Sequence, residues 1–132
     1  MKLNNLLAAV FGRQVSKTWK FLLLIIALVL LYVTLMPSVH VHSHFRHMDK
    51  VFHFIGFGAF AFATTLAFPL FKTYWVILVS IGLGISVELV QSVIPRRAFS
   101  YWDMVADLAG ILFALLVVAI IRWIIKKFAK HD

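Results

Sequence analysis

Acidic residues are scarce in this sequence, and four of them lie near the ends of long apolar segments. The 132 residues include 13 Lys and Arg but only 5 Asp and Glu. The four acids are Asp49, Glu88, Asp103 and Asp107. Within a membrane span, a carboxylate costs on the order of 2.5 to 3.5 kcal/mol unless it has a partner or a polar cavity. We therefore expect these four acids to share one site inside a helix bundle.

Other polar side chains follow these acids at helical spacing. His53 comes four residues after Asp49, and Gln91 comes three residues after Glu88, so each pair shares one face of a helix. Cations lie in the same neighbourhood. The candidate binding residues are Asp49, Lys50, His53, Glu88, Gln91, Arg96, Arg97, Asp103 and Asp107. The two arginines suit bidentate binding of a phosphate or a carboxylate.

This cluster has two interpretations. In the first, Glu88 and Asp107 pair with His53 or with neighbouring cations and only lock the helices together. In the second, the cluster lines a small polar pocket that opens to the outer headgroup layer and binds a ligand. Asp103 also has a local interpretation as a helix N-cap, because a carboxylate there accepts free backbone N–H groups.

Histidines precede and enter the second apolar segment, so metal binding is a further hypothesis. Three histidines alternate over residues 40–44, and His47, Asp49 and His53 follow them. Imidazole and carboxylate groups are ligands for zinc and other divalent ions, which makes these last three residues weak metal candidates. No HExxH-type motif fixes a geometry, and the alternative is a solvated loop with imidazoles at the headgroup level. We therefore expect no resident cofactor.

The composition around these residues is that of a membrane protein. Hydrophobic residues make up 63% of the chain and charged residues 14%, and the mean hydropathy is +0.97. These values exclude a water-soluble enzyme or DNA-binding domain. The chain has no cysteine, which excludes disulfides and thiolate chemistry. The net charge of +8 indicates membrane orientation and contact with anionic lipid rather than a nucleic-acid partner.

Four apolar segments are long enough to cross a bilayer, so we expect an all-α, polytopic membrane protein with a four-helix bundle. The predicted spans cover about residues 19–36, 50–71, 74–94 and 102–125. A short turn should make the second and third spans an antiparallel hairpin. Small residues such as Gly56 and Gly58 indicate that the second span is an interior helix.

The predicted organisation has three parts: an N-terminal interfacial segment (1–18), the membrane domain (19–125) and a basic cytoplasmic tail (126–132). Residues 3–15 have the apolar spacing of an amphipathic helix, and a basic leader is the alternative. The end of the first span lacks small residues at A-x-A spacing, which predicts an uncleaved anchor.

The distribution of Lys and Arg predicts the orientation of the chain. Nine of these residues fall on the side of both termini and the 2/3 turn, and four fall on the other side. The positive-inside rule then places both termini in the cytoplasm and the 1/2 and 3/4 loops outside. We expect the bacterial cytoplasmic (inner) membrane.

The chain resembles the VanZ-like family of small bacterial membrane proteins over about residues 45–120. The resemblance rests on Asp49-Lys50-Val51-Phe52-His53-Phe54, on Glu88-Leu89-Val90-Gln91, on Pro95 with Arg97, and on Asp103 to Gly110. The family pattern opens the last helix with D-x-x-x-N-x-x-G, whereas this chain has Asp107 at the amide position. The resemblance implies a four-helix inner-membrane protein of the cell envelope, in some members linked to glycopeptide (teicoplanin) resistance, without a settled activity.

Two classes of function fit these observations. The first is a non-enzymatic envelope protein whose pocket binds an anionic lipid, a lipid-linked wall precursor or a partner protein. The second is a membrane-embedded hydrolase or transferase acting on a lipid phosphate, with His53 as acid or base, although no nucleophile is evident. Ion passage is a third hypothesis, but the polar residues fade toward the cytoplasmic half. So small a bundle is compatible with a homodimer or a membrane partner protein.

Overall fold

The computed structural model describes residues 13–36, 48–95 and 98–128. Within these ranges the chain is helical and contains no strand. The helices are α2 (Arg13–Leu35), α3 (Met48–Ala67), α4 (Thr73–Gln91) and α5 (Tyr101–Phe128). All four are long and apolar enough to cross a membrane. The prediction of an all-helical, multi-pass membrane protein is therefore confirmed.

Each helix overlaps one predicted span, but the helix ends differ from the predicted boundaries. α3 ends at Ala67 rather than near residue 71, because Pro69 disfavours the helical conformation of the residue before it. α5 continues through Lys126 and Lys127, where cations are favourable near the negative end of the helix dipole. α2 begins at Arg13, inside the segment assigned to the interface. The amphipathic helix expected over 3–15 falls almost entirely outside the described residues.

α3 is the interior helix, as its small residues predicted. It packs most extensively against α5 and next against α2, and less against α4, which follows it in the chain. The contact with α5 is close because Gly58 and Gly110 face each other. A Cβ atom on Gly110 would overlap the carbonyl oxygen of Phe54, and one on Gly58 would lie 3.1 Å from the Gly110 carbonyl oxygen. Close backbone approach at glycine is a common way for helices to associate in lipid.

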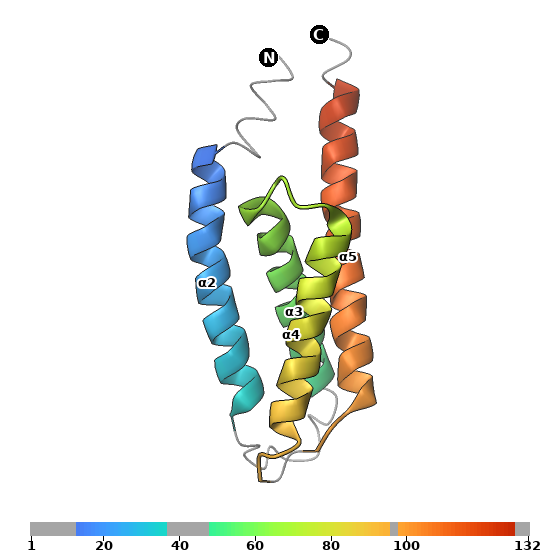
Figure 1. The fold of residues 1–132 in the computed structure, drawn as a ribbon. Helices are drawn as coiled ribbons and strands as arrows, with labels where there is room; N and C mark the ends of the chain where they lie inside the picture. Colours follow the sequence, from blue (N-terminus) through green and yellow to red (C-terminus); the bar gives the residue numbers. More distant parts are fainter. Residues whose placement is uncertain (1–12, 37–47, 96–97, 129–132) are drawn as a thin grey trace.

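α2 begins and α5 ends at the same end of the bundle, next to the α3–α4 connection (Figure 1). At this end the Ser16 hydroxyl donates a hydrogen bond of 2.6 Å to the Ala67 carbonyl oxygen. The ammonium group of Lys20 lies 5.1 Å from the centre of the Phe68 ring. These contacts join the start of α2 to the end of α3, as an antiparallel arrangement requires.

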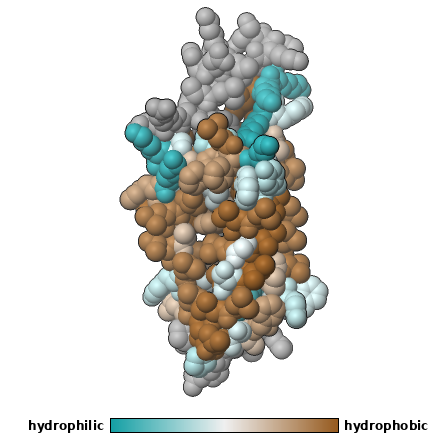
Figure 2. Space-filling view, viewed as in Figure 1, coloured by the Kyte–Doolittle hydropathy of each residue, from teal (hydrophilic) through white to brown (hydrophobic). Residues whose placement is uncertain are grey.

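Apolar side chains cover the middle of the bundle on the face shown in Figure 2, with hydrophilic residues toward its ends. Large apolar residues point outward from several helices, including Leu28, Leu78 and Leu116. In a soluble protein this surface would be an aggregation hazard, whereas in a bilayer it contacts lipid tails. Exposed apolar residues are thus accounted for by the bilayer, and the polar groups inside the bundle are the candidates for a functional site.

Candidate functional site

The predicted polar residues meet at the bundle end opposite the start of α2. Asp49, Lys50 and His53 lie in the first two turns of α3, and Asp103 and Asp107 lie in the first two turns of α5. The last turn of α4 reaches the same end, as Figure 1 shows. Polar and small residues that follow one another at steps of three or four on α4 and α5 are all buried: Ser80, Gly84, Glu88, Gln91, Asp103, Asp107, Gly110 and Ala114.

His53 and Asp107 form the innermost polar pair. Nδ1 of His53 lies 2.8 Å from Oδ1 of Asp107, and the two residues are 1% and 4% exposed. The imidazole also stacks on the ring of Phe57, with centroids 6.0 Å apart. His53 Nε2 and Asp107 Oδ2 are buried without a hydrogen-bond partner in the parts of the chain that the structure describes. Because burying such atoms unpaired is costly, both are positions where a ligand or an ion would be stabilised.

Lys50 and Asp103 form a second link between α3 and α5. Lys50 Nζ donates a hydrogen bond of 3.2 Å to Asp103 Oδ1, with the lysine side chain 38% exposed and the aspartate side chain 6% exposed. Asp103 is not the N-cap of α5, contrary to the local interpretation. α5 starts at Tyr101, and the hydroxyl of Ser100 accepts a 3.3 Å hydrogen bond from the Asp103 backbone N–H. Ser100 is thus the cap, which leaves the Asp103 carboxylate to face α3.

Glu88 and Gln91 connect α4 to its neighbours through backbone atoms. Oε2 of Glu88 accepts a 2.8 Å hydrogen bond from the Ser100 N–H. Gln91 Nε2 donates a 2.5 Å hydrogen bond to the carbonyl oxygen of Thr34 in the last turn of α2, where carbonyl groups lack helical partners. Both side chains are almost completely buried. The locking interpretation thus fits Asp107, which bonds His53, whereas Glu88 bonds a backbone N–H in place of a histidine or a cation. Oε1 of Glu88 has no hydrogen-bond partner within the described residues.

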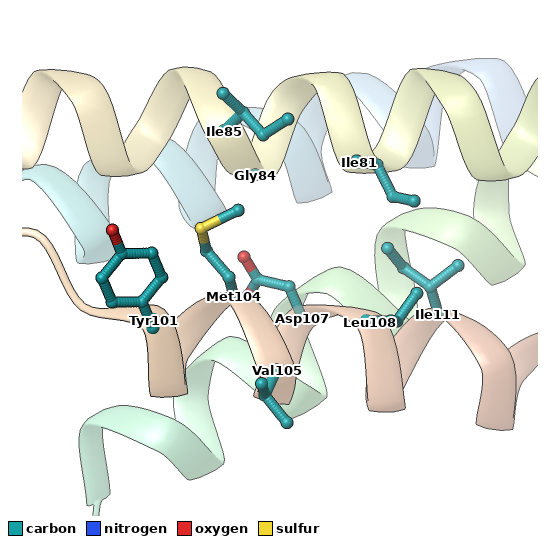
Figure 3. A pocket seen from close by; sticks show the side chains of 9 residues that line it. All are labelled: Ile81, Gly84, Ile85, Tyr101, Met104, Val105, Asp107, Leu108 and Ile111. Carbon is teal, nitrogen blue, oxygen red and sulfur yellow. The ribbon is translucent and has the colours of Figure 1, made fainter.

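A groove of about 300 Å³ lies between α4 and α5 (Figure 3). Its lining is Ile81, Gly84, Ile85, Tyr101, Met104, Val105, Asp107, Leu108 and Ile111. The Asp107 carboxylate points from α5 toward Gly84 on α4, as Figure 3 shows. A Cβ atom at Gly84 would lie 2.9 Å from Asp107 Oδ2, so glycine makes room for the carboxylate. The sequence predicted a polar pocket, but this groove is mainly apolar, and Asp107 is the one acid among its lining residues.

One group of residues has the arrangement of metal ligands. Asp49, His53 and Asp103 each present a ligand atom, and these atoms all lie within 4.8 Å of one another. The sequence indicated Asp49 and His53 as metal candidates, but it indicated Asp103 only as a candidate binding residue. Asp103 lies one turn before Asp107 on α5, and this spacing could have suggested a role at the same site. Only the packing of α5 on α3 brings Asp103 to His53.

Three predicted residues lie outside the described parts of the chain. These are His47, Arg96 and Arg97. The groove residues Tyr101, Met104, Leu108 and Ile111 were missed by sequence reasoning, because apolar residues in a membrane helix carry no signal that separates a groove wall from a lipid-facing surface.

Comparisons with protein-family models, curated proteins and solved structures give no match. The assignment of function therefore depends on the geometry of the site and on the motifs of this chain.

Proposed function

We propose that this chain is an envelope protein of the VanZ-like type in the bacterial cytoplasmic membrane, and that it binds a membrane amphiphile with an anionic head group. The observation that carries the proposal is the α4–α5 groove. It combines an apolar lining with a buried carboxylate oxygen of Asp107 that has no partner among the residues of 13–36, 48–95 and 98–128. Small-molecule sites commonly have this character, with a mainly apolar wall and a few placed polar groups.

The length of the groove suits a segment of acyl or prenyl chain. From Tyr101 to Ile111 the α5 wall extends about 15 Å at 1.5 Å per residue. Four of its lining side chains are also exposed on the outside of the bundle, namely Tyr101, Ile85, Val105 and Leu108. A chain can therefore enter sideways from the bilayer without unfolding a helix.

Individual cations at this end of the bundle can pair with a phosphate head group. Lys50 is partly exposed beside Asp103, at the level where headgroups lie if this end faces outward. The sequence adds Arg96 and Arg97 in the α4–α5 connection, outside the described residues. Asp107 lies roughly 9 Å deeper than Tyr101, where its Oδ2 can accept a hydrogen bond from a hydroxyl or amide between head group and chain.

The proposal is tested by lipid retention in nanodiscs of phosphatidylcholine doped with phosphatidylglycerol or with a polyprenyl phosphate, followed by native mass spectrometry. Leu108→Trp should fill the groove and weaken retention by about 1 kcal/mol or more, about fivefold in affinity. Leu112→Trp is the matched control, because Leu112 is an exposed α5 leucine one turn further on and does not line the groove. Equal retention in both variants would contradict the proposal, and the two doped lipids distinguish a phospholipid from a wall-precursor carrier.

A second candidate function is hydrolysis or transfer of a lipid phosphate. The bonded pair of His53 and Asp107 favours it, because a carboxylate commonly orients a histidine that acts as acid or base. Ser100 is occupied as the cap of α5 and has no such base in contact in the described chain. Release of phosphate from lipid phosphates by wild type but not by His53→Ala would establish this activity. No release with any divalent metal leaves lipid binding as the function.

A further inference from the structure

The first turns of α3 and α5 hold a mixed set of nitrogen and oxygen ligands. We propose that Asp49, His53 and Asp103 bind one divalent transition-metal ion, with Zn²⁺ as the probe of choice. This site lies beside the lipid groove but does not depend on it. Imidazole with carboxylates is a donor set that suits zinc and its neighbours, and three protein ligands leave a coordination position for water or a ligand.

The distances are close to those that one ion requires. Ligand atoms bound tetrahedrally to the same Zn²⁺ at 2.0–2.2 Å lie roughly 3.3 to 3.6 Å apart. The three ligand atoms lie within 4.8 Å of one another, so side-chain rotations that close a gap of about 1 Å bring them to the ion. Asp49 and His53 are one turn apart on α3, and Asp103 faces them from α5. Asp49 is the most exposed of the three, which gives the ion a path to water.

An independent observation is the state of the His53 ring. His53 is 1% exposed, and no described residue forms a hydrogen bond with its Nε2. Its Nδ1 is bonded to Asp107. In metal sites the ring nitrogen that does not bind the ion usually donates its N–H to a carboxylate, which sets the tautomer and directs the lone pair of the other nitrogen to the metal. Asp107 is thus a positioning residue for His53 rather than a ligand.

The charge balance at this end also favours a cation. The described side chains here include four carboxylates, and the cations among them are Lys50, which is paired with Asp103, and His53 when protonated. Lys50 contacts one oxygen of Asp103, so the second oxygen of that carboxylate is the one available to an ion. Lys50 therefore competes electrostatically with the metal for Asp103.

The test uses the full chain in phosphatidylcholine nanodiscs, with Zn²⁺ binding measured by titration calorimetry and metal content measured after dialysis. Wild type should bind one Zn²⁺ per chain. Asp49→Asn, His53→Ala and Asp103→Asn should each weaken binding by about tenfold or more, and Asp107→Asn by about tenfold through loss of histidine orientation. Asp132→Asn is the matched control, because it also removes one carboxylate but not one assigned to the site.

Circular dichroism and thermal melting report whether each variant folds. If the variants at buried positions fail to fold, Asp49→Asn still tests the proposal, because Asp49 is the most exposed of the three ligands. Mg²⁺ should bind more weakly than Zn²⁺, since imidazole is a poor ligand for it. Absence of stoichiometric zinc in wild type, or equal binding by folded Asp49→Asn and Asp132→Asn, would overturn the proposal.

Lys50→Met separates the metal site from the lipid site. Removing the competing cation should tighten Zn²⁺ binding by about threefold or more, because the electrostatic repulsion between the lysine ammonium group and the ion is lost. The same variant should weaken retention of an anionic lipid. Zinc binding that is lost in Lys50→Met would overturn the metal assignment, whereas unchanged lipid retention bears only on the proposed function. Zinc is measured in neutral lipid, so the failure of one proposal leaves the other intact.

Discussion

The polar side chains of the candidate site have two different kinds of partner. Gln91 bonds a backbone carbonyl group of α2, and Glu88 accepts a backbone N–H from the α4–α5 connection. In contrast, His53 and Asp107 bond each other, and each retains a polar atom without a partner among the described residues. Under the proposed VanZ-like resemblance, the family pattern has an amide at position 107. An ionised carboxylate there bonds the imidazole more strongly than an amide would.

Gly84→Ala should disturb this pair without unfolding the bundle. The new methyl group would lie 2.9 Å from Asp107 Oδ2, so the carboxylate must move and its bond to His53 should lengthen. We expect the His53 ring N–H proton resonance to move upfield in NMR spectra of the selectively labelled protein. Gly82→Ala is the control, because a Cβ atom there meets nothing within 4 Å. An unchanged His53 signal in Gly84→Ala would show that the carboxylate does not rest against Gly84.

At the scale of the helices, α3 determines where the site forms. Its small residues allow α5 to approach at Gly58 and Gly110, and this contact sets the separation of the first turns of both helices. The same contact therefore places Asp103 beside His53 and Asp107 within reach of its Nδ1. α4 contributes less packing to α3 but closes one side of the groove.

Gly110→Val should disrupt the bundle. A Cβ atom at this position overlaps the Phe54 carbonyl oxygen, and backbone cannot rotate away as a side chain can. We expect a loss of roughly 1 to 3 kcal/mol or more in unfolding free energy, as for overpacking of a core. Stability can be measured by denaturation in mixed micelles. Gly82→Val provides the comparison at an open position, and equal stability of the two variants would argue against the α3–α5 contact.

For the whole molecule, most of the described lysines and all of the described acids lie at opposite ends. Lys17, Lys20, Lys72 and the basic end of α5 lie together, and the candidate site lies at the far end, where Lys50 is paired with Asp103. We expect a chain with this asymmetry to orient by the positive-inside rule. In that orientation the proposed lipid and metal sites would face the outer leaflet.

Orientation can be tested directly because the chain contains no cysteine. A single cysteine at Ala98 should react with a membrane-impermeant maleimide in intact spheroplasts, whereas one at Lys72 should react only after permeabilisation. Both positions lie in connections between helices, so the substitutions leave the spans unchanged. Labelling of Lys72→Cys in intact spheroplasts together with protection of Ala98→Cys would reverse the orientation and place the site in the cytoplasm.

The sequence by itself determined the four spans and the inward faces of α4 and α5, because apolar length and helical periodicity are local properties of the chain. It also indicated that Asp49, His53, Glu88 and Asp107 share one end. Only the tertiary structure decided that His53 bonds Asp107, that Asp103 pairs with Lys50 rather than capping α5, and that a groove lies beside Gly84. The two side-chain pairs join residues more than fifty positions apart, and the groove depends on how closely two helix backbones approach, which periodicity cannot specify.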